Sequence, residues 1–308
     1  MRFRVICLMG PTASGKTDFS LRLAEEIPCE IISVDSAMVY KTMDIGTAKP
    51  TPEQRLQVKH HLIDIADPWH PYSAAKFAQD AVEAIRSIHL QGKTPILVGG
   101  TMLYFKALQQ GLSPLPPADE GIRARLMEEA MAVGWAEMHQ RLAKVDPLAA
   151  TRINPNDPQR IQRALEVHEI TNKSLSSLWE TAGHSDLPCD YINIAIAPHD
   201  RTMLHENIEQ RFHKMMQEGF LEEVQQLYHC DNIHIDLPSI RSVGYRQAWQ
   251  YLAGKITHAQ LYEMGIAATR QLAKRQLTWL RHWGTMHWID SMDNNAYQNL
   301  LQHLFRHL

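Results

Sequence analysis

The feature that most constrains this chain is the segment Gly10–Thr17, which reads GPTASGKT. It fits the pattern G-x-x-x-x-G-K-[ST], in which two glycines let successive backbone N–H groups face one anion. The segment lies between an apolar stretch, Phe3–Met9, and an amphipathic stretch, Thr17–Ile27, which predict a strand and a helix. This order predicts an α/β fold with a phosphate site at the end of its first strand. The alternative is a glycine loop that only turns the chain.

The residue types in this loop suit an anion. The helix N-terminus carries partial positive charge, Lys16 adds a mobile full charge, and the Thr17 hydroxyl can ligate Mg²⁺ between phosphate oxygens. The pattern leaves open which phosphate ester is bound. The expected binding residues are Gly10, Thr12, Ala13, Ser14, Gly15, Lys16 and Thr17, with Thr17 as the metal ligand.

Strand and helix patterns continue to alternate as far as about residue 110. Glu30–Val34 and Thr94–Val98 predict buried strands, and Ser73–Leu90 predicts an amphipathic helix. We therefore expect an α/β, P-loop NTPase-like parallel sheet flanked by helices, with its site at the carboxyl ends of the strands. Asp35 follows one strand and the glycine turn Gly99–Thr101 follows another. From the residues alone, Asp35 could be a group in the ligand crevice, a helix N-cap or a carboxylate linked to Mg²⁺.

The pair His60–His61 lies at a further strand tip. Two histidines could suggest a metal, but neighbouring residues of a strand point to opposite faces. We therefore expect packing or hydrogen bonding for both.

A rigid segment, Ser113–Pro117, marks a boundary in the chain. Residues 114–189 carry helical patterns and no convincing strand, so we expect a helical insertion domain between two parts of the core, residues 1–113 and 190–308. Within the insertion, Asp157 and Pro158 predict a helix start before Gln159–Ile170. The arginines of this helix could be a solvated basic face or an RNA contact.

The C-terminal part returns to the sheet with the strand Tyr191–Ile196 and continues with helices, among them Arg201–Gln217 and Ala267–Trp283. Arg211 could reach the phosphate loop or be an ordinary surface arginine. The last helix places Arg270, Lys274 and Arg281 on one face, which suits a phosphate backbone. The apolar residues Leu272, Ala273, Trp279, Leu280 and Trp283 fall on the other side.

The segment Arg241–Arg246 adds two cations, an aromatic side chain and a flexible glycine, a mixture suited to looped RNA. A solvated charged surface is the alternative for both basic segments. Between residues 240 and 285 seven Lys or Arg stand against one acidic residue, although the 308-residue chain has a net charge of −3.

Composition adds limits on the class of protein. A hydrophobic content of 44% fits a soluble chain of one large domain or two smaller ones. No apolar stretch approaches the roughly 20 residues of a membrane span, and no signal peptide is apparent, so we expect a cytoplasmic protein with no membrane partner. The four cysteines are widely spaced and predict neither a disulfide framework nor a structural zinc site.

Together the motifs resemble one family, the bacterial-type tRNA dimethylallyltransferases, also called isopentenyl-diphosphate:tRNA transferases. We expect the shorter bacterial form, without the zinc finger of eukaryotic relatives. The matching segments run in order along the chain: GPTASGKT at Gly10–Thr17, DSAMVY at Asp35–Tyr40, DIGTAKP at Asp44–Pro50, GGTMLYFKAL at Gly99–Leu108, GLSPLP at Gly111–Pro116, NDPQR and RALEV within Asn156–Val167, LPSIRSVGYRQ at Leu237–Gln247 and TRQLAKRQLTWLR at Thr269–Arg281.

The resemblance implies transfer of a dimethylallyl group from dimethylallyl diphosphate to N6 of the adenosine 3′ to the anticodon. The phosphate loop would then bind the diphosphate, with Mg²⁺ and Arg211, rather than ATP. The resemblance implies Asp35, Thr101 and Lys16 as catalytic residues, with Asp35 as the general base. The adenine would be flipped into a channel whose far end holds the diphosphate.

The resemblance also implies a monomer whose macromolecular partner is the tRNA anticodon stem-loop. Four segments and two single residues would contact it. The implied tRNA-binding residues are Asp35, Ser36, Ala37, Met38, Thr101, Arg123, Gln159, Arg160, Ile161, Gln162, Arg163, Arg241, Ser242, Val243, Gly244, Tyr245, Arg246, Lys274, Arg275, Gln276, Thr278, Trp279 and Arg281.

Two other functions share the phosphate loop. A P-loop kinase of a small metabolite would bind ATP there and use Asp35 to activate a hydroxyl, but would leave the basic segments unexplained. A non-catalytic, RNA-associated NTP switch would need loops that sense the γ-phosphate, which the sequence does not reveal.

Overall fold

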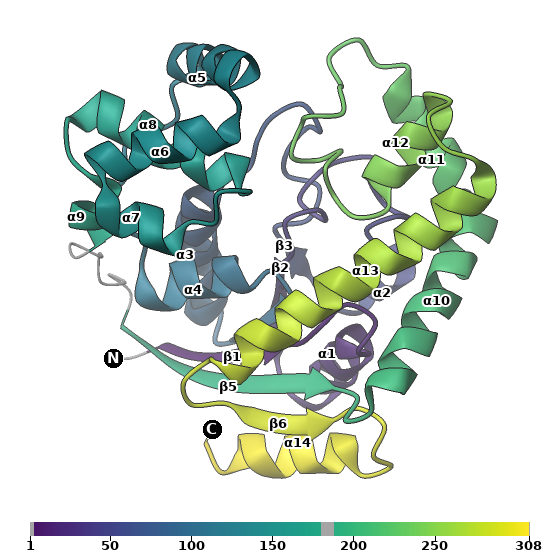
Figure 1. Cartoon of the computed structure of the whole chain (residues 1–308). Coiled ribbons are helices and arrows are strands. Elements are labelled where there is room, and N and C mark those ends of the chain that lie inside the picture. The colour runs from purple at the N-terminus through teal and green to yellow at the C-terminus, as the bar shows by residue number, and fades with distance from the viewer. Residues whose placement is uncertain (1–2, 180–187, 308) are drawn as a thin grey trace. The chain divides into compact units, whose positions relative to one another are not determined.

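A computed structural model describes residues 3–179 and 188–307 and divides the chain into two compact units (Figure 1). Unit 1 combines Met1–Gln109 with Leu187–Leu308, and unit 2 is Gln110–Asp186. The insertion expected over residues 114–189 differs from unit 2 by a few residues at each end.

Unit 1 contains a six-stranded sheet in which all neighbouring strands are parallel, in the order β3-β2-β4-β1-β5-β6. The expected α/β class and parallel sheet are confirmed. The last strand was not expected from the sequence, because four residues are too few to show a strand pattern. The strands are β1 (Phe3–Met9), β2 (Cys29–Val34), β3 (His60–His61), β4 (Thr94–Gly99), β5 (Cys189–Ala197) and β6 (His287–Asp290).

The register of the central strands sets the position of the site. Gly99 at the end of β4 pairs with Met9 of β1 on one side and with Val34 of β2 on the other. Three strands therefore end in one row, and the residues that follow them leave the sheet together. These residues are Gly10, Asp35 and Gly100, so the register brings the phosphate loop, the carboxylate and the second glycine turn to one edge.

Helices cover both faces of the sheet, as the alternation of buried side chains in β1 requires. Ile6 and Leu8 pack with residues of α1 and α14 on one face, whereas Cys7 and Met9 pack with residues of α3, α4, α10 and α13 on the other. Figure 1 shows α10 and α13 running side by side. These helices are α1 (Lys16–Glu26), α3 (Ala74–Leu90), α4 (Met102–Gln110), α10 (Arg201–Gln217), α13 (His258–Arg281) and α14 (Ala296–Phe305).

A second cluster of buried side chains joins α10 and α13 to α11 (Phe220–Tyr228) and α12 (Tyr245–Leu252). A short α2 (Pro52–Gln57) completes unit 1. Helix α13 begins nine residues before the expected start at Ala267, because Thr257 and Gln260 form a capping box that begins the helix there.

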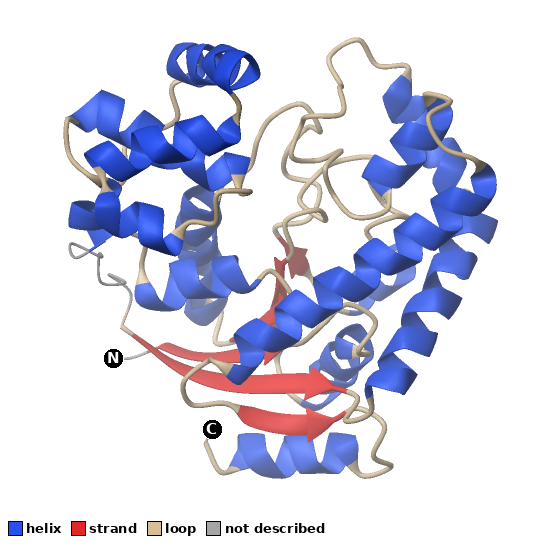
Figure 2. Cartoon of the chain, viewed as in Figure 1, coloured by secondary structure: helices blue, strands red, loops and turns tan. Residues whose placement is uncertain are grey.

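The described part of unit 2 consists of helices and loops (Figure 2). The expected N-cap is confirmed: the Asp157 side chain accepts from the N–H of Arg160, and Pro158 is the first helical residue. Within residues 3–179 and 188–307 no helix is long and apolar enough to cross a membrane. The helices are α5 (Glu120–Val133), α6 (Trp135–Val145), α7 (Pro147–Arg152), α8 (Pro158–Thr171) and α9 (Leu175–Trp179).

Candidate active site

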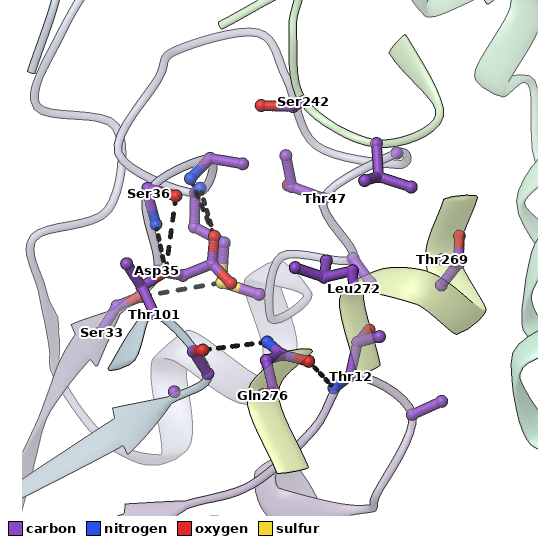
Figure 3. Close-up of a pocket in the computed structure, with 18 of the residues that line it drawn as sticks. Thr12, Ser33, Asp35, Ser36, Thr47, Thr101, Ser242, Thr269, Leu272 and Gln276 are labelled. Carbon is purple, nitrogen blue, oxygen red and sulfur yellow. Dashed lines mark hydrogen bonds between the residues drawn. The ribbon is translucent and has the colours of Figure 1, made fainter. Parts of the chain in front are cut away.

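A pocket of about 540 Å³ opens at the carboxyl edge of the sheet, entirely within unit 1. Its walls come from the phosphate loop, the ends of β2 and β4, helices α10 and α13, and the loop before α12. The structure thus brings together Lys16, Asp35, Thr101 and Arg211, four residues that the sequence places far apart. Figure 3 shows Asp35, Thr101 and Thr12 around this pocket.

The phosphate loop has the backbone of an anion cradle. Gly15 lies in the left-handed region with φ 84° and is the N-cap of α1. Ala13 also has a positive φ, of 61°, which side chains seldom adopt and which bends the loop. No side chain caps the start of α1. The helix N-terminus is therefore available to a negatively charged ligand.

Two cations line the pocket above this loop. The ammonium of Lys16 lies 2.5 Å from the carbonyl oxygen of Pro11, and Arg211 projects from α10. The pKa of Lys16 is lowered to about 7, chiefly by burial and also by the positive charge of Arg211, while Asp35 acts in the opposite direction. Burial also lowers the pKa of Arg211. Two poorly hydrated cations that repel each other favour an anion between them.

Asp35 is held by the backbone that follows it. Its Oδ1 accepts from the N–H groups of Ala37, at 2.8 Å, and Met38, at 3.3 Å. Thr101 joins the same turn, because its hydroxyl oxygen accepts from the N–H of Ser36 at 3.0 Å. One strand end and one glycine turn thus present a carboxylate and a hydroxyl to the same pocket.

Gln276 differs from its expected role as an RNA contact. Its side chain is 8% exposed and hydrogen-bonds inside the protein at both ends of its amide. Oε1 accepts from the N–H of Thr12, and Nε2 donates to the carbonyl oxygen of Gly100, both at 2.9 Å (Figure 3). Both polar ends of this amide are therefore occupied by backbone groups of the protein.

The far wall of the pocket includes Gly46 and Thr47 of the DIGTAKP segment. The carboxylate of Glu223, in α11, accepts from three backbone N–H groups of this loop, at 2.7, 2.7 and 3.1 Å. Lys49 is buried at the other end of the loop and contacts Asp64 and Asp44. Sequence reasoning missed Glu223, because an acidic residue in the first turn of a helix looks like an ordinary exposed one.

The basic side chains of α13 divide into two groups. Lys274, Arg275 and Arg281 are exposed, whereas Arg270 pairs with Glu209 of α10 at 2.8 Å. Trp279, which the helical projection places on the apolar side of α13, is 39% exposed and lines the pocket. The core contacts come instead from Ala273, Leu277 and Leu280.

The glycine of the segment before α12, expected to be flexible, forms the start of this helix. Gly244, with φ 90°, is the N-cap of α12, and its N–H donates to the side chain of Gln247. Tyr245, predicted as an RNA-binding residue, is completely buried and donates to Glu223 at 2.6 Å. Arg241 and Arg246 are exposed, and Ser242 and Val243 line the pocket.

In unit 2 the expected RNA-binding residues surround a buried carboxylate. Glu166 is wholly buried and pairs with Arg123 and Arg163, at 2.8 and 2.7 Å. Burial alone would raise the pKa of Glu166, but hydrogen bonds from the two arginines lower it overall. Of the predicted RNA-binding residues of α8, Ile161 packs in the core of unit 2, whereas the side chain of Arg160 is 70% exposed.

The expected interpretation of the histidine pair is confirmed. His61 hydrogen-bonds to the buried carboxylate of Glu30 at 2.6 Å, and His60 hydrogen-bonds to the carbonyl oxygen of Val58 at 2.8 Å. Among residues 3–179 and 188–307, no group of three His, Cys, Asp or Glu side chains could hold a metal ion. A cation at the phosphate loop would take its oxygen ligands from the Thr17 hydroxyl, the bound phosphate and water, which is the donor set that suits Mg²⁺.

A parallel α/β sheet with a phosphate loop, two cations and a neighbouring carboxylate defines a P-loop protein that acts on a phosphate ester. The IPP transferase family model matches residues 38–283. The chain belongs to this family. It is 53% identical over 300 residues to a tRNA dimethylallyltransferase of Coxiella burnetii strain Dugway 5J108-111, covering 97% of this chain and 96% of the relative.

Solved structures agree with this assignment. The tRNA isopentenylpyrophosphate transferase of Bacillus halodurans aligns with a TM-score of 0.72 and 35% identity, covering 99% of this chain and 96% of that one. The corresponding enzyme of Staphylococcus epidermidis gives a TM-score of 0.70 and 31% identity, with both chains fully covered. A eukaryotic dimethylallyltransferase acting on tRNA gives 0.80 at 27% identity, covering 97% of this chain and 78% of its own.

Proposed function

We propose that this protein transfers the dimethylallyl group of dimethylallyl diphosphate to N6 of the adenosine 3′ to the anticodon of tRNA. Relatives that cover nearly the whole chain carry the name tRNA dimethylallyltransferase. The observation that carries the proposal is the pairing of Gly99 with both Met9 and Val34. This register places an anion cradle and a carboxylate around one pocket, as a transfer between a diphosphate and an amine requires.

The first part of the chemistry is departure of the diphosphate. As the bond between C1 of the allyl group and oxygen breaks, its electron pair goes to the diphosphate. Lys16, Arg211 and the N-terminus of α1 stabilise the charge that accumulates there. Mg²⁺ bound by the Thr17 hydroxyl would neutralise part of the same charge.

The second part is attack by N6 and loss of its proton. The new bond joins N6 to C1, and the proton passes to Asp35 as general base. We assign this proton to Oδ2, because Oδ1 already accepts from two backbone N–H groups. Thr101 holds the turn and lies beside the adenine. An adenine stacked in an anticodon loop is out of reach, so it must first be flipped into the pocket.

The RNA itself is assigned to the exposed cations. Lys274, Arg275 and Arg281 of α13 and Arg246 of α12 contact phosphates, and Arg160 of α8 provides a further contact from unit 2. Arg123 and Arg163 position this part of α8 through Glu166.

One assay tests the reaction against its main rival. The protein is mixed with Mg²⁺, radiolabelled dimethylallyl diphosphate and an anticodon stem-loop that carries adenosine at the target position. Label in the RNA is the expected result, and a stem-loop with guanosine at that position is the control that stays unlabelled. No label in RNA together with turnover of ATP would instead support the small-metabolite kinase, which uses the same loop.

A further inference from the structure

One buried side chain at the wall of the pocket connects the phosphate loop to the second glycine turn. The amide of Gln276 accepts from the N–H of Thr12 in the phosphate loop and donates to the carbonyl oxygen of Gly100 in the second glycine turn, each at 2.9 Å. In sequence these partners are 264 and 176 residues away. Both hydrogen bonds are backbone contacts, so they constrain the path of the two loops rather than the side chains of the site.

The helix that carries this amide is rigidly placed. Ala273, Leu277 and Leu280 of α13 are almost fully buried in the core that covers one face of the sheet. Gln276 lies between these residues and is itself 8% exposed. A side chain fixed to a packed helix can hold two loops at a set separation, which a side chain on a mobile loop cannot do.

The second glycine turn is shaped to receive the amide. A Cβ atom at Gly100 would lie 2.3 Å from Nε2 of Gln276 and 2.9 Å from the carbonyl oxygen of Gly10. Only glycine allows the phosphate loop, this turn and the amide to meet so closely. The next residue, Thr101, donates its N–H to the carbonyl oxygen of Val34 and accepts from Ser36, on either side of Asp35.

We propose that Gln276 is a positioning residue that fixes the diphosphate loop relative to the Asp35 and Thr101 turn. The inference rests on the proposed function, because the two halves hold the leaving group and the nucleophile of one reaction. Gln276 touches neither substrate and acts through Thr12 and Gly100. A small shift between the two halves would lengthen the path between C1 and N6 and slow the transfer, while both substrates would still bind.

The test uses Gln276→Met, which keeps the size of the side chain and removes both hydrogen bonds. The matched control is Gln271→Met, an exposed glutamine of the same helix. Single-turnover transfer with enzyme in excess separates two quantities: the amplitude gives the folded, competent fraction, and the rate constant gives the transfer step. We expect the rate constant to fall about 10- to 100-fold in Gln276→Met with full amplitude and unchanged apparent RNA affinity, and no change in Gln271→Met.

Other results would overturn the inference. A reduced amplitude with an unchanged rate constant would mean that Gln276 only stabilises the fold. Weaker RNA binding with an unchanged rate constant would make it an RNA contact, and an unchanged variant would give it no role. If Gln276→Met does not fold, Gln276→Glu is measured in the same way; it retains the acceptor for Thr12 and loses the donor to Gly100, and we expect a similar fall in rate constant. Failure of the wild-type chain to label RNA would contradict the proposed function instead.

Discussion

We propose two tasks for the Asp35 carboxylate, and a substitution can separate them. Oδ1 closes the turn by accepting from Ala37 and Met38, whereas we assign the proton of N6 to Oδ2. Asp35→Asn keeps an oxygen acceptor for the turn and removes the base. We expect kcat to fall about 10²- to 10⁴-fold with unchanged RNA affinity, because general base catalysis contributes about that much. Transfer assays and RNA titrations measure the two effects.

Asp35→Ala removes both the base and the turn and is the natural comparison. A loss of RNA affinity in Asp35→Asn as large as its loss of kcat would make Asp35 a binding residue rather than a base.

The lowered pKa of Lys16 predicts how diphosphate binding depends on pH. In the free protein burial and Arg211 lower its pKa from 10.5 to about 7, so the side chain is charged below pH 7 and loses its proton above it. A bound anion favours the charged form, so binding above pH 7 must take up a proton. We therefore expect affinity for Mg²⁺-pyrophosphate to fall between pH 7 and 9, more steeply in the wild-type chain than in Lys16→Met.

Calorimetry at pH 8 in buffers with different ionisation enthalpies measures this proton uptake directly. Lys16→Met should bind about 10- to 100-fold more weakly at pH 7, the effect of losing a charged hydrogen bond. The same pH dependence of binding in both proteins would show that the titrating group belongs to pyrophosphate and not to Lys16.

At the scale of single elements, α13 carries both core contacts and the proposed RNA contacts. Lys274 is exposed, whereas Arg270 on the same face pairs with Glu209. We expect Lys274→Ala to weaken RNA binding and to reduce the slope of log affinity against log salt by about one, since one phosphate contact is lost. Filter binding at several salt concentrations measures the slope.

Arg270→Ala is the matched control for Lys274→Ala. Its charge is already engaged within the protein, so its slope should stay close to that of the wild-type chain. Equal slopes for wild type and Lys274→Ala would remove this part of α13 from the interface.

The sequence predicted those elements whose signal is local. The boundaries of β1 and α10 agree with the structure residue for residue. Strand β1 is a short apolar stretch that ends just before Gly10, and α10 begins directly after its N-cap, Asp200. Strand β6 was missed, since its place is set by pairing with β5 across the chain. A helical projection groups Trp279 with the apolar residues of α13, but it does not show that a pocket, rather than core, faces that side chain.

The site shows the same difference between residues with a local sequence signal and residues placed by distant contacts. Residues in the phosphate-loop motif could be named from their spacing, and Asp35 from its place at a strand end. Gln276 and Glu223 could not be assigned, because their partners are backbone groups of loops far away in the sequence. A polar side chain in a helix gives no signal of where its hydrogen bonds go until the helix has been placed.

For the molecule as a whole, the two cations in the pocket link ligand binding to stability. Lys16 and Arg211 repel each other in the free protein, and an anion between them relieves this repulsion. A ligand that binds only the folded state stabilises it by RT ln(1 + [L]/Kd), about 2.7 kcal/mol at one hundred times Kd. We expect Mg²⁺-pyrophosphate at that excess to raise the unfolding temperature by roughly 5 °C.

Removing the metal tests how much of this stabilisation depends on Mg²⁺. The Thr17 hydroxyl supplies one oxygen, and the described residues offer no acidic cluster that would hold the ion without the phosphate. Chelation should therefore leave the unfolding temperature of the free protein unchanged and reduce the shift caused by pyrophosphate. Thermal scans of wild type, Thr17→Val and Lys16→Met separate the contributions. Lys16→Met should lose most of the shift, and Thr17→Val should respond to pyrophosphate equally with and without Mg²⁺. A destabilised free protein after chelation would instead require a metal site away from the phosphate loop.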